Sequence, residues 1–141
     1  EMARAALDAG AQYLISPNVD EGMIAYALKQ GVPVWPGAMT PTEIVRAWKL
    51  GAGAVKVFPS GSLGLAYIKE IRAPLSHIPM IATGGVSLDN VTAFLEAGVV
   101  GVGIGGNLVD RKRIAAGKFD EIRDLAEQFV RKVKAFQEER R

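Results

Sequence analysis

The sequence predicts a parallel α/β protein of the (β/α)8 type, the TIM barrel, with about five βα units present in the chain. Three observations predict this fold. Short apolar segments rich in Val, Ile and Leu recur every 20 to 25 residues, centred near Leu14, Val34, Lys56, Ile81 and Val102. Amphipathic helical patterns separate them, and strands that alternate with helices in this way form a parallel sheet. Polar and turn residues follow each apolar segment, at the strand ends where ligands bind in such folds.

The helices between the strands are expected near residues 20–30, 41–50, 63–73 and 87–97, followed by a longer one from about 120 to 140. A glycine directly follows four helical segments, where a C-terminal cap favours a left-handed backbone: Gly10, Gly31, Gly51 and Gly98. The longest helix carries its apolar residues on one face. Phe119 and Phe136 are therefore expected in the core.

Residues 1–141 are interpreted as a single domain, the C-terminal part of a barrel. The chain opens within a helical pattern at Glu1–Arg4, without a capping residue or an initiator methionine. Five strands cannot close an eight-stranded barrel, and unpaired sheet edges promote aggregation. We therefore expect the three N-terminal βα units of the barrel to be absent from this sequence.

Composition excludes several classes of site. The 141 residues include no cysteine, which excludes disulfides and thiolate metal sites, and a single histidine, His77, which is expected to be structural in a helix-to-strand connection. The net charge of +2 is too small to indicate nucleic-acid binding. No apolar run approaches the roughly 18 residues of a membrane span. We expect a soluble, cytoplasmic protein that uses no metal and no cofactor.

Lys56 is the main candidate for chemistry. It lies in the apolar strand pattern 54–58, and burying an unpaired ammonium costs several kcal/mol or displaces its proton. A neutral lysine amine forms Schiff bases with carbonyl substrates. Strand alternation puts Val55 and Val57 on the helix side, so Lys56 should point inward, near the mouth of the barrel. The alternative is an edge lysine that extends into water.

Two glycine-rich turns predict a phosphate site. Thr83-Gly84-Gly85 and Gly105-Gly106-Asn107 follow consecutive strands, where barrels often bind phosphate through backbone N–H groups. The alternative for each is a plain tight turn. Residues 101–106 also match G-x-G-x-x-G, but the glycines lie largely within the strand and no second strand ending in an acidic residue follows. The dinucleotide-binding interpretation is therefore disfavoured.

As an ordered set, the motifs resemble the 2-keto-3-deoxy-6-phosphogluconate (KDPG) aldolase family, strands four to eight. The residues that carry the resemblance are Ile15-Ser16-Pro17, Pro36 to Glu43 (PGAMTPTE), Lys56 to Gly61 (KVFPSG), Ala82 to Val86 (ATGGV) and Ile104 to Leu108 (IGGNL). Together they span essentially the whole chain.

The resemblance implies a class I, metal-independent aldolase, an aldehyde-lyase that acts on a phosphorylated keto acid and assembles as a homotrimer. It implies that Lys56 forms the Schiff base and that Thr83 binds the substrate carboxylate. It also implies that Pro17 and Phe58 line the pyruvyl group, and that Gly84, Gly85, Gly106 and Asn107 hold the phosphate.

The chain departs from the family at several positions. Ala82, Asn107 and Asn18 stand where the family commonly has Pro, Ser and Gly. The family's general acid/base glutamate lies on a strand that this sequence does not contain, and Glu43 cannot replace it because it belongs to a helix. We therefore expect the chain alone not to be an efficient enzyme.

Other functions remain open. The substrate could be the galactonate epimer or 4-hydroxy-2-oxoglutarate. The chain could be a phosphate-binding transferase of the thiamine-phosphate-synthase type, with a structural Lys56. It could also be a non-catalytic half-barrel that binds phosphorylated ligands or pairs with another chain.

Overall fold

The computed structural model describes residues 1–140 and contains parallel strands at all five predicted positions. The strands are β1 (Leu14–Ile15), β2 (Val34–Trp35), β3 (Gly37–Ala38), β4 (Val55–Val57), β5 (Met80–Thr83) and β6 (Gly101–Gly103). They pair in the orders β1-β2 and β3-β4-β5-β6, always in parallel. This is the order expected of consecutive βα units in a barrel wall.

The second predicted strand is divided into β2 and β3 by Pro36. Proline has no backbone N–H to give to a ladder. The Pro36 carbonyl nevertheless accepts the Lys56 N–H at 2.9 Å, and the Ala38 carbonyl accepts the Phe58 N–H at 3.0 Å. The strand thus pairs with β1 before the proline and with β4 after it.

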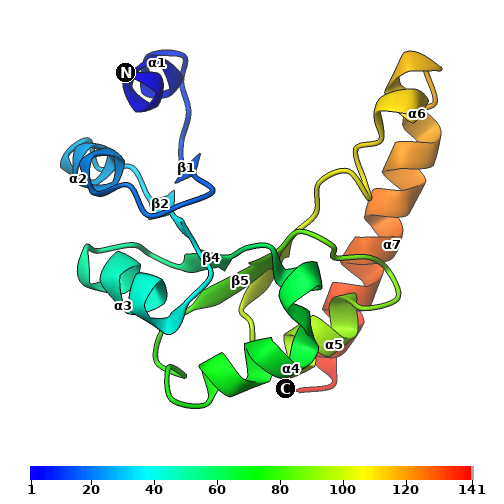
Figure 1. Ribbon diagram of the computed structural model, residues 1–141. Coiled ribbons are helices and arrows are strands. Elements are labelled where there is room, and N and C mark those ends of the chain that lie inside the picture. Colours follow the sequence, from blue (N-terminus) through cyan, green and yellow to red (C-terminus); the bar gives the residue numbers. More distant parts are fainter. Residues whose placement is uncertain (141) are drawn as a thin grey trace.

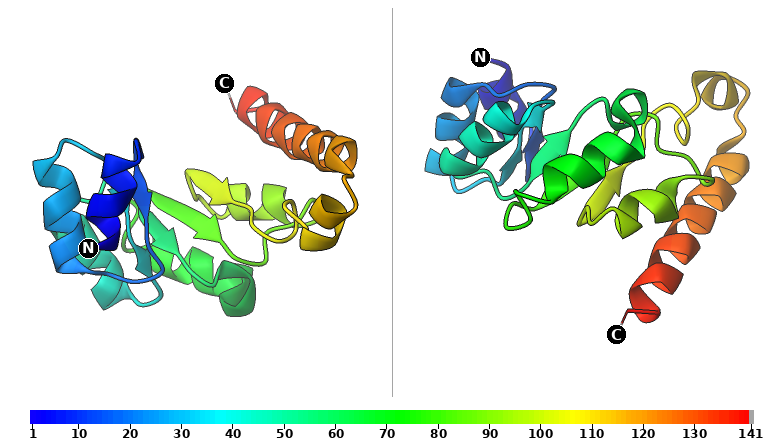
Figure 2. Two further views of the ribbon diagram at one scale, coloured as in Figure 1. Left: turned by 90° about the horizontal axis from the view of Figure 1, so that it is seen from above. Right: turned by 60° about the horizontal axis from the view of Figure 1, so that its bottom comes forward.

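The described part of the chain contains seven helices. They are α1 (Met2–Asp8), α2 (Glu21–Lys29), α3 (Pro41–Lys49), α4 (Ser60–Arg72), α5 (Val91–Glu96), α6 (Arg111–Ala115) and α7 (Phe119–Glu138). Helices α2 to α5 form an arc outside the strands (Figure 1). In both views of Figure 2, α1 and α2 lie at one end of the molecule and α6 and α7 at the other. The elements therefore follow one another in chain order, as in a segment of a (β/α)8 barrel.

The predicted helix starts needed two corrections. Helix α4 begins three residues early, at Ser60, and is interrupted at Gly64, which has φ 83° and ψ 164°. Helix α5 begins only at Val91, because the Asn90 side chain accepts the Ser87 N–H and donates to the Gly85 carbonyl, which holds the preceding residues in a turn. The short helix α6 was not predicted. The four capping glycines do have positive φ, as expected.

The core lies between the strands and the outer helices. Val55, Val57 and Met80 have no exposed surface, and Phe129 of α7 is also buried. Phe136 packs against this core, as predicted. The prediction for Phe119 was wrong, since its side chain is 62% exposed. It is the first residue of α7 and lies outside the turns that reach the core.

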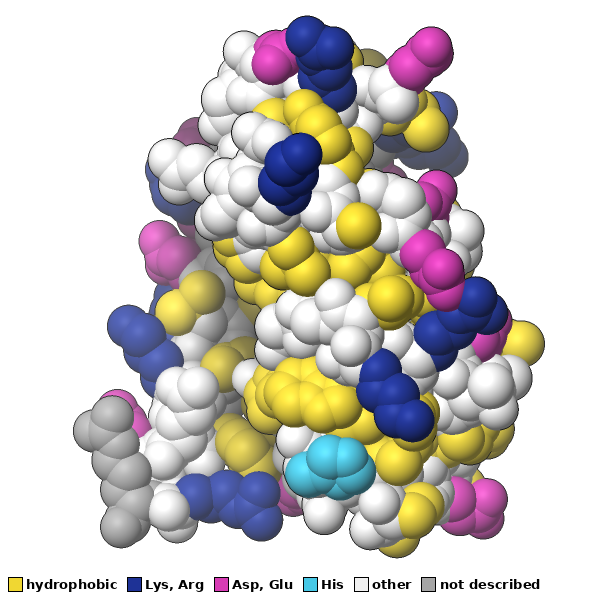
Figure 3. Space-filling view, turned by 90° about the vertical axis from the view of Figure 1, so that its left-hand side faces the viewer, with side chains coloured by type: hydrophobic (Ala, Val, Ile, Leu, Met, Phe, Trp, Pro, Cys, Tyr) yellow, Lys and Arg dark blue, Asp and Glu magenta, His cyan; other side chains and the backbone are white. Residues whose placement is uncertain are grey.

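The face shown in Figure 3 carries patches of hydrophobic side chains and, among the described residues, no cluster of charge of one sign. Lys and Arg side chains are scattered there among hydrophobic patches, and the single histidine lies at the surface. None of the helices described in residues 1–140 is long and apolar enough to cross a membrane. The same residues contain no group of three or more His, Asp or Glu side chains that could hold a metal ion.

Candidate active site

Lys56 occupies the position that strand alternation predicts. Its neighbours Val55 and Val57 have no exposed surface, whereas Lys56 is half-buried on the opposite face of the strand. Its Nζ lies 4.5 Å from the centroid of the Phe58 ring. No ion pair of the described residues includes Lys56. Burial therefore lowers the pKa of the Lys56 amine without a nearby anion to oppose it.

The strand register places Lys56 between a glycine and an isoleucine. Gly37 of β3 and Ile81 of β5 are its Cα partners, and Ile81 is paired in turn with Gly101 of β6. A methyl group on Gly101 would meet no atom within 4 Å. The level of the sheet that contains Lys56 therefore has open space on the β6 side. Two residues before Gly37, toward the amino ends of the strands, Trp35 stacks on Tyr13 with ring centroids 5.1 Å apart.

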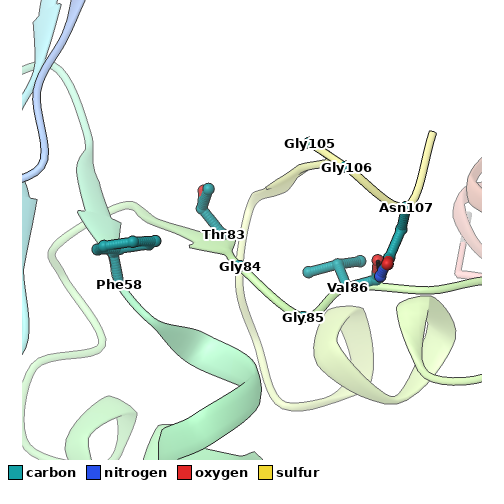
Figure 4. Close-up of a pocket in the computed structure, with 8 residues that line it drawn as sticks. All are labelled: Phe58, Thr83, Gly84, Gly85, Val86, Gly105, Gly106 and Asn107. Carbon is teal, nitrogen blue, oxygen red and sulfur yellow. Dashed lines mark hydrogen bonds between the residues drawn. The ribbon is translucent and has the colours of Figure 1, made fainter. Parts of the chain in front are cut away.

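A pocket of about 290 Å³ opens next to Phe58, at the carboxyl ends of β4, β5 and β6. In Figure 4, Phe58 and Thr83 lie on one side of it and the Gly105–Asn107 turn on the other. The lining residues are Phe58, Thr83, Gly84, Gly85, Val86, Gly105, Gly106 and Asn107. Gly103 leaves space for Thr83, because a Cβ there would lie 2.7 Å from the Thr83 hydroxyl.

The loops of this pocket present backbone donors. Gly84 and Gly85 have φ of 85° and 75°, a conformation that side chains disfavour. Within residues 1–140, no hydrogen bond uses the N–H groups of Gly84, Gly85, Gly106 or Asn107. Successive unpaired N–H groups in such turns form anion-binding concavities. The pocket therefore has the geometry of an anion site.

The Asn107 side chain connects the two loops. Its Nδ2 donates to the Val86 carbonyl at 2.7 Å. One amide hydrogen is thus used to hold the turn after β6 against the turn after β5. The backbone N–H of Asn107, a lining residue of the pocket, has no partner among residues 1–140.

Comparison with known proteins identifies the family of this chain. Residues 1–125 match the protein-family model described as aldolase, KDPG and KHG aldolase. The chain belongs to the KDPG and KHG aldolase family. It is 37% identical over 130 residues to the 2-dehydro-3-deoxy-6-phosphogalactonate aldolase of Escherichia coli (strain K12), covering 92% of this chain and 60% of that protein. It is 35% identical over 129 residues to the 2-dehydro-3-deoxy-phosphogluconate aldolase of Treponema pallidum (strain Nichols), covering 91% of this chain and 61% of that one.

A solved structure described as native KDPGal agrees with the fold. It is 32% identical in sequence with a TM-score of 0.89, over 97% of this chain and 65% of that one. The predicted family and the predicted barrel fold are thus confirmed. The chain spans about 60% of the length of the two aldolases named above.

The pocket of this aldolase-family chain brings together six of the eight predicted site residues, and Lys56 lies directly beside it through its contact with Phe58. Pro17 lies elsewhere. It is exposed and lines a separate pocket of about 730 Å³ between α1, the turn after β1 and α2. Strand β3 separates β1 from β4, and the Pro17 carbonyl abuts Gly37 of β3. Pro17 and Phe58 thus line different pockets, and the substrate contact expected of Pro17 stays a prediction.

Glu43 lies in the first turn of α3, the helix to which the sequence assigned it. Its Oε2 accepts hydrogen bonds from the Thr40 N–H (2.8 Å), the Thr40 hydroxyl (2.8 Å) and the Met39 N–H (3.0 Å). These bonds hold the pKa of the Glu43 carboxyl below its usual range. The carboxylate serves as part of a capping box.

Ser60 is the residue that sequence reasoning missed. The sequence indicated only a Pro-Ser-Gly turn after the lysine strand. In the structure the Ser60 hydroxyl is completely buried and joins the ends of β4 and β5. A serine directly after the proline that ends a strand was the available signal, but it did not indicate which backbone groups the hydroxyl would meet.

Proposed function

We propose that this chain carries the imine-forming lysine and the phosphate-binding loops of a class I aldolase that cleaves 2-keto-3-deoxy-6-phosphogluconate to pyruvate and glyceraldehyde 3-phosphate. The observation that carries the proposal is the position of Lys56, whose half-buried amine lies beside a pocket with unpaired backbone donors. Membership of the aldolase family supports it.

In the proposed reaction, the neutral Lys56 amine attacks C2 of the keto acid and forms a carbinolamine. Loss of water gives an iminium, which accepts the electron pair of the C3–C4 bond when that bond breaks. The C4 hydroxyl loses its proton as C4 becomes the aldehyde of glyceraldehyde 3-phosphate. The remaining enamine is protonated at C3, and hydrolysis of the imine releases pyruvate and the free lysine.

Each site residue of this chain would have a separate role in the reaction. Lowering of the Lys56 pKa by burial increases the fraction of neutral amine near pH 7. Thr83, at the end of β5, would bind the substrate carboxylate, and the glycine loops would hold the phosphate. Phosphate binding supplies energy remote from the bond that breaks and holds the substrate near the lysine. By resemblance to the family, a glutamate on a strand outside residues 1–141 would move the C4 proton.

The galactonate epimer is a second candidate substrate. One relative is named a phosphogalactonate aldolase and the other a phosphogluconate aldolase, at 37% and 35% identity. The two acids differ in configuration at C4. Cleavage rates of both epimers by the same preparation would identify the preferred one.

Borohydride trapping tests the imine. The protein is incubated with pyruvate and reduced, and the added mass is located by peptide mass spectrometry. We expect an adduct on Lys56 that is absent in Lys56→Met, is retained in Lys69→Met on the exposed surface of α4, and is unchanged after treatment with a chelator. An unmodified Lys56 in protein that binds phosphate would instead support a phosphate-binding barrel with a structural lysine.

We also propose a homotrimer located in the cytoplasm, on the basis of the family resemblance. Light scattering of the purified protein measures its mass directly. A monomer mass across the micromolar range would contradict the trimer.

A further inference from the structure

Ser60 has an unusual environment for a polar side chain. Within residues 1–140, the buried polar or charged residues are Ser16 and Ser60, and only Ser60 has no exposed surface. A buried hydroxyl must be paired to avoid a desolvation penalty. The hydrogen-bond partners of the Ser60 hydroxyl therefore indicate its structural role.

The Ser60 hydroxyl bonds to two different strands. It donates to the Val57 carbonyl at 2.7 Å and accepts the Thr83 N–H at 3.1 Å. Val57 is the last residue of β4, the lysine strand, and Thr83 is the last residue of β5. Because Pro59 is the residue that precedes α4, the hydroxyl does not cap its own helix.

Gly61 adds a second connection at the same place. Its N–H donates to the Gly84 carbonyl at 2.7 Å, and a Cβ on Gly61 would lie 2.8 Å from the Gly85 Cα. The two backbones are thus in direct contact. We call residues 60–61 and 83–85 the β4–β5 clasp. It joins the strand of Lys56 to the loop that lines the anion pocket.

We propose that Ser60 is a positioning residue that fixes the Thr83–Gly85 loop relative to the Lys56 strand, so that the backbone donors of Gly84 and Gly85 are aimed at the substrate's phosphate. This inference rests on the proposed function for its ligand. Its geometry rests on the two hydrogen bonds of the hydroxyl and the close contact at Gly61.

The test compares Ser60→Ala with Ser62→Ala, which removes an exposed hydroxyl from the same turn of α4. Binding of inorganic phosphate is measured by calorimetry at a temperature where circular dichroism shows both variants to be folded. We expect Ser60→Ala to weaken phosphate binding about 10-fold, the effect of losing one well-placed hydrogen bond. Ser62→Ala should match wild type. Trapping of pyruvate on Lys56 at saturating pyruvate should persist in Ser60→Ala.

Folded Ser60→Ala with wild-type phosphate affinity would overturn the proposal, as would a wild-type protein that binds no phosphate. If Ser60→Ala fails to fold, Ser60→Cys replaces it, since a thiol keeps the shape but bonds weakly. Weaker phosphate binding is again the expected result, and unchanged affinity overturns the proposal. Failure of the aldolase function is seen separately, as the absence of a Lys56 adduct in wild type.

Discussion

The lysine side of the site and the glycine-loop side are built from different parts of their residues. On β4 the proposed chemistry depends on one side chain, Lys56, kept on the inward face by the buried valines on either side of it. On β5 and β6 it depends on backbone N–H groups, and the residue types matter mainly through the conformations that they permit. One substitution can delete the function of a side chain. The function of a backbone N–H group changes only when the conformation of the loop that carries it changes.

Gly85→Ala should produce the largest effect on the loop side. Its φ of 75° disfavours a side chain by about 1–2 kcal/mol, and the new Cβ would lie 2.8 Å from the Gly61 Cα. We expect phosphate affinity to fall by at least about 10-fold, with the Lys56–pyruvate adduct retained. Gly53→Ala, in the turn before β4, has space for its methyl group and serves as the control. Loss of adduct and phosphate binding together would show that the two sides are not separable.

The pH dependence of pyruvate trapping tests the lowered pKa of Lys56. Burial lowers the pKa of Lys56 from its ordinary value of 10.5, so the rate of imine formation should reach its half-maximum below that pH. The lowered pKa of Lys56 also makes the free energy of unfolding depend on pH. Between the lowered pKa and 10.5 the unfolded chain binds more protons, so the wild type should gain stability as pH rises through this window.

The matched variant for this test is Lys56→Met, which has no titrating group at that position. Urea unfolding at a series of pH values, for both proteins, measures the difference. A wild-type curve parallel to that of Lys56→Met would contradict the lowered pKa.

Asn107→Ala should have a smaller effect on the loop side. It removes the Nδ2 bond to the Val86 carbonyl but keeps the backbone N–H of residue 107. We expect phosphate binding to weaken about 5-fold, as for the loss of a hydrogen bond of about 1 kcal/mol. Asn18→Ala, an exposed asparagine outside this pocket, should leave phosphate titrations unchanged. Tighter phosphate binding by Asn107→Ala would mean that the hydrogen bond from Asn107 to the Val86 carbonyl disfavours anion binding.

Arg72→Met should affect neither side of the site. Arg72 lies at the opposite end of α4, where its guanidinium donates to the carbonyls of Leu75, Ser76 and Ile78. Its loss should lower the free energy of unfolding by about 1–3 kcal/mol, whereas Lys69→Met should not. Phosphate affinity and trapping, measured below the melting transition, should equal those of wild type. A change in either would show that the amino ends of the strands influence the site.

Strand positions, helix order and the capping glycines could be predicted from local patterns, because apolar periodicity and positive φ leave direct signatures in sequence. The inward direction of Lys56 followed from alternation with Val55 and Val57. The pocket that Pro17 lines could not be predicted, since its neighbours depend on how three strands meet. Ser60 was missed for the same reason, because Thr83 is 23 residues away and nothing local to either residue indicates the bond.

The interruption of α4 at Gly64 has a mechanical consequence. The first turn of the helix is connected to the strands by Ser60 and Gly61, while the remainder packs its own buried residues, Ile68 and Ile71, against the core. With a non-helical residue between them, the two parts need not share an axis, and tilting of the longer part is not transmitted as a rigid rod. Gly64 therefore separates the turn that is bonded to the strand ends from the longer helical segment that packs on the core.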